Sequence, residues 1–214
     1  MGDEGIWRQV VAQVAVIGAS RPWQDRLAPV WDAEGMTWSR LTTAPDLRDE
    51  ATRAMAFHAL FARHGVRYVG DGRIPAAKAL ACARNFESLR AAGGPHAWAV
   101  QVSQHRDEAS RIRAVRGALA QVGSKGARDL LMDLGMSIDT IALDSRVMGT
   151  LHTAGVTKIK KPTTQAAYAA LEAEVIRELA VATGLKPIEV DRTLYQRSQE
   201  IRERLARSGM VASG

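Results

Sequence analysis

The sequence predicts an all-α protein. Apolar residues recur at helical spacing along most of the chain. Aromatic residues make up only 5% of it, whereas Ala, Leu and Arg are abundant, and this composition favours helix over sheet. One segment, Val66–Arg73, could form a short strand and turn, but the sequence predicts no second strand that could pair with it. We therefore expect an irregular connection there and helices almost everywhere else.

The N-terminal part of the chain predicts one buried helix followed by shorter pieces. Gly5–Gly18 is apolar on nearly every side, which indicates a buried helix. Small residues and Pro22 end it, and they would permit close backbone approach, although a plain C-cap explains them equally well. The segments that follow are Trp23–Gly35 and Met36–Pro45 as short helical or loop pieces, then helices over Leu47–Gly65 (N-cap Asp46, C-cap Gly65), Ile74–Leu89 and His96–Val102.

The C-terminal part predicts five further helices. They cover Glu108–Val122, Ser124–Leu134, Ser145–Ala154, Pro162–Thr183 and Ile188–Arg207. Asp144 stands where the N-cap of the third belongs, and a basic loop at Lys158–Pro162 precedes the fourth. We expect Ser208–Gly214 to be frayed.

Charge and cysteine content narrow the functional classes. The net charge of +6 suggests a polyanionic partner, nucleic acid before an anionic membrane, with an inert basic surface as the alternative. Cys82 is the only cysteine, so a disulfide framework and cysteine-ligated zinc or iron–sulfur sites are excluded, and a buried thiol is expected. The sequence shows no secretory signal or membrane span, which predicts an intracellular, cytoplasmic protein without a membrane partner. We also expect a monomer.

A lysine and an aspartate stand out as candidates for chemistry. Lys125 lies in a Gly-bounded turn, Val122–Ala127, and Asp144 follows 19 positions later, across one short helix. An amine and a carboxylate at this separation can share one pocket. A lysine whose pKa is lowered can attack the C1′ atom of a sugar and form an imine, and a carboxylate can stabilise the cationic transition state. Taken alone, Lys125 is also consistent with an ordinary helical lysine, and Asp144 with a helix cap.

The surroundings of this pair predict contact with a phosphate backbone. Several arginines lie on the helix that leads into the turn, and the N-terminus of the next helix exposes unpaired amides. A solvated charged face is the alternative for the arginines. The candidate DNA-binding residues are Arg116, Gly123, Ser124, Gly126, Arg128 and Arg146. No metal site is expected.

The segments Val122–Ala127 and Ala142–Val147 resemble the helix-hairpin-helix motif of a superfamily of DNA glycosylases with a lysine nucleophile and a catalytic aspartate. The resemblance implies that Lys125 forms the Schiff base and that Asp144 is the catalytic carboxylate. It also implies two helical subdomains, 46–144 with the hairpin at 119–134, and 1–45 plus 145–214, with the active-site cleft between them. No cofactor is implied, apart from a monovalent cation on the hairpin carbonyl oxygens.

The rest of the chain is similar to one branch, the small 8-oxoguanine DNA glycosylase/lyases of archaea and some bacteria. The similar segments are Val14–Ser20, His64–Tyr68 with Lys78, Ala83–Phe86, Tyr168 with Glu172, and Glu189–Asp191 with Leu194–Tyr195. This resemblance implies excision of a damaged guanine from double-stranded DNA in base-excision repair, followed by β-elimination. It places base recognition near Ala19 and Ser20 and at Tyr195, for which a core tyrosine is the alternative.

Two departures from the branch keep other functions open. Gln121 stands where the family usually has glycine, and the chain lacks the terminal lysine that helps the branch to recognise the oxidised base. Excision of a different modified base is therefore one alternative. A monofunctional glycosylase, in which Lys125 only contacts phosphate, is a second, and a non-catalytic helix-hairpin-helix DNA-binding module is a third.

Overall fold

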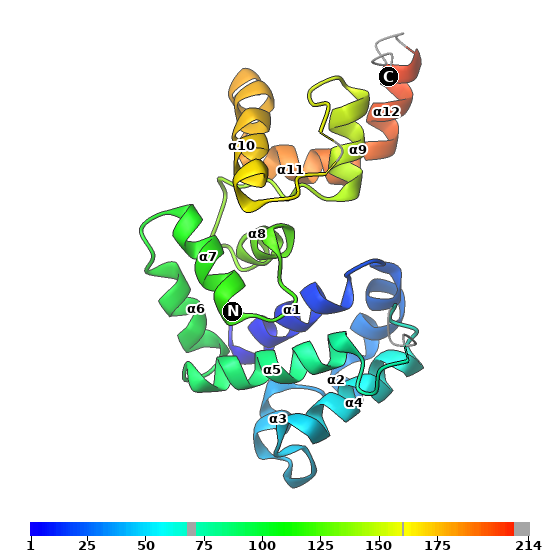
Figure 1. The fold of residues 1–214 in the computed structure, drawn as a ribbon, viewed down its shortest axis with the longest axis vertical. Coiled ribbons are helices and arrows are strands. Elements are labelled where there is room, and N and C mark those ends of the chain that lie inside the picture. The colour runs from blue at the N-terminus through cyan, green and yellow to red at the C-terminus, as the bar shows by residue number, and fades with distance from the viewer. Residues whose placement is uncertain (68–71, 160, 208–214) are drawn as a thin grey trace. The chain divides into compact units, whose positions relative to one another are not determined.

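The computed structural model describes residues 1–67, 72–159 and 161–207, and every regular element in these ranges is a helix (Figure 1). The all-α prediction is therefore confirmed for the described part of the chain. The predicted connection at Val66–Arg73 and the basic loop lie partly outside that part, and the C-terminal Ser208–Gly214 lies wholly outside it. No described helix is long and apolar enough to cross a membrane.

The chain divides into two compact units, Met1–Gly123 and Ser124–Gly214. This division differs from the predicted one, which grouped 46–144 apart from 1–45 and 145–214. Residues 1–45 belong with the rest of the first unit because the N-terminal helix packs against two later helices of that unit. The elements of the first unit are α1 (Asp3–Ala15), η1 (Pro22–Leu27), η2 (Ala28–Val30), α2 (Trp31–Glu34), α3 (Trp38–Thr43), η3 (Pro45–Leu47), α4 (Glu50–Arg63), α5 (Ala77–Ala91), α6 (Pro95–Ser103) and α7 (Glu108–Ala118).

The core of the first unit is built around Trp7 of α1. Its ring is fully buried and meets Trp38, Phe57 and Phe86 edge-on, with centroids 5.8–6.1 Å apart. Burial of large aromatic side chains from four helices is the main stabilising contribution here. Cys82 is buried in the same unit, as the sequence predicts.

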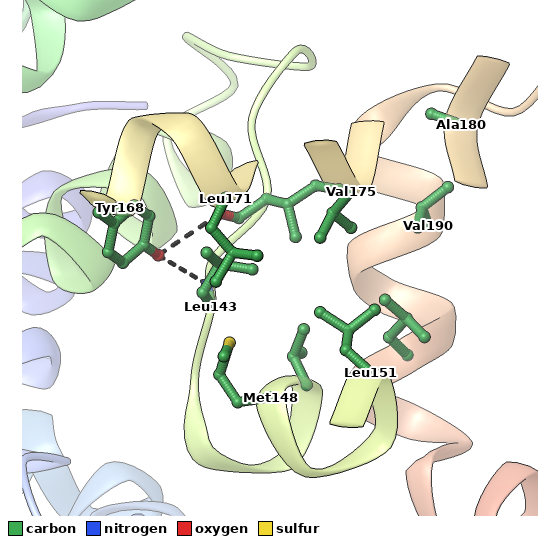
Figure 2. Packing of buried hydrophobic residues seen from close by; sticks show 11 residues of the cluster. Leu143, Met148, Leu151, Tyr168, Leu171, Val175, Ala180 and Val190 are labelled. Atoms are coloured by element: carbon green, nitrogen blue, oxygen red, sulfur yellow. Dashed lines mark hydrogen bonds between the residues drawn. The ribbon is translucent and has the colours of Figure 1, made fainter. Parts of the chain in front are cut away.

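The second unit has its own apolar core. It contains α8 (Ser124–Asp133), α9 (Ser145–Thr153), α10 (Gln165–Val175), η4 (Ile176–Val181), α11 (Pro187–Gln196) and α12 (Ser198–Arg207). Figure 2 shows buried side chains from α9, α10, η4 and α11 converging with Leu143, which lies in the segment before α9. This core therefore fixes the place of the segment that ends at Asp144.

Several predicted helix ends differ from the observed ones. Asp49, not Asp46, caps α4, because Asp46 lies inside η3 and Asp49 accepts the N–H of Thr52 at 2.8 Å. The predicted helix Ile188–Arg207 is two helices, which meet at Arg197, a residue with φ −104° and ψ 15°. Neither Gly nor Pro marks this junction in the sequence, so pattern alone could not reveal it.

Candidate active site

Lys125 lies in the first turn of α8, where the sequence places the candidate nucleophile. Its side chain is 38% exposed and forms an ion pair with Asp129, one turn further along the helix. The Asp129 side chain is 19% exposed, so the pair is partly withdrawn from water. Asp129 was not singled out from the sequence, although its i,i+4 spacing to Lys125 could have indicated the contact.

Asp144 is the N-cap of α9, as predicted. Its Oδ1 accepts the backbone N–H groups of Arg146 at 2.8 Å and Val147 at 2.7 Å. Within the described residues, no hydrogen bond reaches Oδ2. The cap therefore fixes the carboxylate in one orientation and leaves one oxygen for another partner.

The segment before Asp144 is held by three side chains. Three consecutive backbone N–H groups, those of residues 141, 142 and 143, each donate a hydrogen bond to a different side chain. Their acceptors are Glu172 (3.0 Å), Asp191 (2.8 Å) and Tyr168 (2.6 Å), the last of which Figure 2 shows. An extended segment has no helical partners for its amides, so these bonds supply them and set the position of Asp144. We call these three residues the amide clamp.

Arg128 differs from its predicted role. The sequence placed it among the DNA contacts, but its side chain is buried in an ion pair with Glu172, with 2.8 Å from Nε to Oε1. Its guanidinium also lies over the ring of Tyr168, 4.2 Å from the centroid. Arg128 therefore packs against two residues of the amide clamp, Glu172 and Tyr168, and does not face solvent. Glu172 can bind the planar guanidinium with both carboxylate oxygens inside the unit.

The carboxylates around Lys125 control its charge. Burial lowers the pKa of Lys125, but Asp129, and after it Asp144 and Tyr195, outweigh this effect, and the pKa lies above its usual value. This differs from the lowered pKa that a lysine nucleophile needs. Burial likewise raises the pKa of Asp129 above its usual range, despite the opposing effect of Lys125. The ion pair with Asp129 therefore favours the ammonium form of Lys125.

Asp191, on α11, is a second residue that sequence reasoning did not assign to the site. Burial raises its pKa to about 7, with the charges of Asp129 and Asp144 acting in the same direction. Lys125, Asp129, Asp144 and Asp191 therefore interact electrostatically. They form one site, to which α8, the start of α9 and α11 contribute. The sequence placed Asp191 within a segment of family resemblance, but only the fold shows what it contacts.

Gln121, which stands where the family usually has glycine, lies in the turn before α8. Gln121 adopts φ +61°, the only non-glycine positive φ among the described residues. The residue therefore takes the left-handed conformation that glycine adopts most readily. Asn85 of α5 holds the neighbouring Ala120 through both backbone groups, with 2.6 Å from the Ala120 nitrogen and 3.2 Å to its oxygen.

The other predicted DNA contacts are accessible to different degrees. Arg116 and Arg146 are exposed, and the guanidinium of Arg146 lies 4.8 Å from the ring centroid of Tyr195. Gly123 is exposed, and a Cβ atom added to it would meet no described atom within 4 Å. Ser124 and Gly126 are half-buried, and the Ser124 hydroxyl donates to Gln165 at the start of α10.

The predicted base-recognition residues lie in different units. Ala19 and Ser20 follow α1 in the first unit, whereas Tyr195 is a half-buried residue of α11 beside the core of the second. The end of α1 is fixed by Lys78, whose Nζ donates to the carbonyls of Ala15 and Ile17 at 2.8 Å each. The backbone next to Ala19 is therefore held in place by a buried lysine.

Across residues 1–67, 72–159 and 161–207, no three His, Cys, Asp or Glu side chains are grouped so that they could hold a metal ion. Comparison of the chain with models of protein families, with curated proteins and with solved structures gave no match.

Proposed function

We propose that this protein is a DNA glycosylase with lyase activity, in which Lys125 attacks the sugar and Asp144 stabilises the charge that develops on it. One observation carries the proposal: α8 and the start of α9 bring Lys125 and a fixed Asp144 carboxylate into one electrostatic site. A helix cap at Asp144 would not by itself require a nearby lysine. An ordinary helical lysine at position 125 would not require a carboxylate in a fixed orientation. Their combination is what imine chemistry requires.

The reaction begins with extrusion of the target nucleotide, because the glycosidic bond is not accessible within the base stack. The lone pair of the neutral Lys125 amine forms a bond to C1′, while the bond from C1′ to the base breaks and its electron pair leaves with the base. The amine then loses a proton and the sugar ring opens, with its oxygen protonated, to give the imine. Loss of a C2′ proton and of the 3′ phosphate completes β-elimination.

Asp144 acts on the charge of the transition state. As the base departs, positive charge spreads over C1′ and the ring oxygen, and a carboxylate fixed nearby stabilises it without reorganising. The two hydrogen bonds from α9 keep the Asp144 carboxylate oriented during this step.

The proposed substrate is a modified guanine in double-stranded DNA, with 8-oxoguanine first. This choice rests on the family resemblance of the sequence and on Tyr195, whose ring is partly buried beside the core of the second unit. A flat base can stack on such a ring. Another modified base fits the same features, so the experiment includes several lesions.

The test is a panel of duplexes, each with one modified base or one abasic site, scored for base release and for covalent trapping with borohydride. We expect the parent to release one class of base and to be trapped. Lys125→Gln should abolish trapping. The matched control is Lys186→Gln, because Lys186 is exposed and its cap on α11 uses the backbone N–H.

Three outcomes would contradict the proposal in different ways. Equal trapping of Lys125→Gln would show that another amine is the nucleophile. Base release without trapping would indicate a monofunctional enzyme. Salt-dependent DNA binding with no cleavage of any duplex would indicate a non-catalytic DNA-binding module.

A further inference from the structure

The ion pair between Lys125 and Asp129 adds little to the stability of α8. A lysine one turn before an acidic residue is the less favourable order for an i,i+4 pair, and such pairs contribute only about 0.2–0.5 kcal/mol. Both side chains are partly buried, which opposes the charge of each. The main consequence of the contact is therefore electrostatic. It affects Nζ of Lys125, the atom that attacks the sugar in the proposed reaction.

Asp129 makes the closest charged contact of Lys125. Asp144 also acts on Lys125, but more weakly, and its Oδ1 is already occupied by the cap of α9. The other titratable or charged groups near the pair are Arg128 and Asp133 on α8, Tyr168 and Glu172 on α10, and Asp191 and Tyr195 on α11.

We propose that Asp129 holds Lys125 as an unreactive ammonium in the DNA-free protein and thereby sets the pH at which this lysine attacks its substrate. This inference rests on the proposed function. Asp129 is a positioning residue in this role, since it acts through Lys125 and not on the sugar.

Attack requires that the ammonium first lose a proton. An N–H bond of Nζ breaks, its electron pair stays on nitrogen as the nucleophilic lone pair, and the proton passes to Oδ2 of Asp129 and on to water. The neutral amine no longer attracts Asp129, so the pair separates and Nζ is free to reach C1′. In the absence of the Asp129 charge, burial would favour the neutral amine, and the lysine would lose its proton at lower pH.

The test is the pH dependence of borohydride trapping on an abasic-site duplex under single-turnover conditions, from pH 5.5 to 9.5. An abasic site removes base release from the measurement. We expect the trapping rate of the parent to rise with pH. Asp129→Asn should shift this rise to lower pH by about one unit, which corresponds to about tenfold faster trapping at pH 6, with a similar plateau at high pH.

The matched control is Asp139→Asn, an exposed aspartate of the same unit, which should keep the parent profile. An Asp129→Asn profile identical to the parent, shifted to higher pH, or reduced at every pH would overturn the inference. Asp129→Ser provides a second test with a smaller neutral side chain and should show the same shift.

A measurement without DNA separates this inference from the proposed function. The pKa of Lys125 can be followed by NMR on protein labelled with ¹³C at lysine Cε, with the signal assigned by its loss in Lys125→Gln. Asp129→Asn should lower this pKa, and an unchanged pKa would refute the inference. If the parent is never trapped on any duplex, the proposed function fails, while the NMR titration still decides whether Asp129 controls the charge of Lys125.

Discussion

At the scale of single residues, the candidate site depends on how each side chain is held. Asp144 is held by backbone amides, Lys125 by a neighbouring carboxylate, and Gln121 by the turn in which it lies. The sequence identified all three positions, but it did not show that the neighbours of Lys125 raise its pKa above the usual value. A pKa depends on neighbours that are distant along the chain, and these neighbours are set by the fold.

Replacing Asp144 with Asn should separate its cap from its charge. Asn is as good an N-cap as Asp, so both backbone hydrogen bonds and the melting temperature should be nearly unchanged. Base release should fall by about 10²–10⁴-fold, because the charge that stabilises the transition state is gone. DNA affinity, measured by fluorescence anisotropy, serves as the control and should stay within a few-fold of the parent. Unimpaired base release would reduce Asp144 to a structural cap.

Gln121 offers a test of backbone strain in the turn before α8. The left-handed conformation costs about 1–2 kcal/mol for a residue with a side chain, and glycine avoids this cost but loses more entropy on folding. Gln121→Gly should therefore leave the free energy of unfolding, measured by urea titration, within about 1 kcal/mol of the parent. Gln121→Val should lower it by about 2 kcal/mol, since β-branched residues resist positive φ. A valine variant as stable as the glycine variant would argue against the observed turn.

At the scale of elements, the amide clamp fixes the position of Asp144, which is both the cap of α9 and a residue of the candidate site. Side chains from α10 and α11 reach three consecutive amides of the segment before α9, and the buried Arg128–Glu172 pair of α8 and α10 supports them. The sequence predicted the helices but not their contacts. Glu172 and Asp191 lie 31 and 49 positions along the chain from the amides that donate to them, and no local pattern links them to the segment.

Asp191 should make the stability of the second unit depend on pH. Its folded-state pKa of about 7 lies above the ordinary value of 3.8, so the folded protein binds this proton more tightly than the unfolded chain does. The resulting stabilisation is complete below about pH 4 and is lost as the pH rises through about 7. Asparagine cannot ionise and can still accept the N–H of Ala142.

Calorimetry at two pH values tests this expectation. Asp191→Asn should melt at a higher temperature than the parent at about pH 8 and at the same temperature at about pH 4. Asp139→Asn is the control, because that side chain is exposed. If both variants follow the parent curve at both pH values, then Asp191 does not bind its proton more tightly in the folded protein.

At the scale of the whole molecule, the basic net charge predicts how the affinity for DNA depends on salt. The chain carries a net charge of +6, and its affinity for DNA should fall steeply with salt because phosphate contacts release counterions. Each arginine that contacts a phosphate contributes about one unit to the slope of log affinity against log salt.

The effect of an arginine substitution on the salt dependence of DNA affinity should depend on whether that arginine contacts a phosphate. Arg116→Gln and Arg146→Gln should each reduce that slope by about one unit, since both residues are exposed. The exposed Arg177, which pairs with Glu178, is the control and should leave the slope unchanged when replaced by Gln. A slope that none of these substitutions alters would place the DNA contacts on a different surface.

The sequence by itself determined the helical class, most helix positions, the cap at Asp144 and the buried thiol, because these follow from periodicity, capping and composition along the chain. The tertiary structure decided the grouping of α1 with the first unit, the burial of Arg128, the amide clamp and the pairing of Lys125 with Asp129. It also split the predicted last helix at Arg197, where the chain carries neither Gly nor Pro. These features arise from packing between segments far apart in sequence, and the charge of a partly buried lysine is set by that packing.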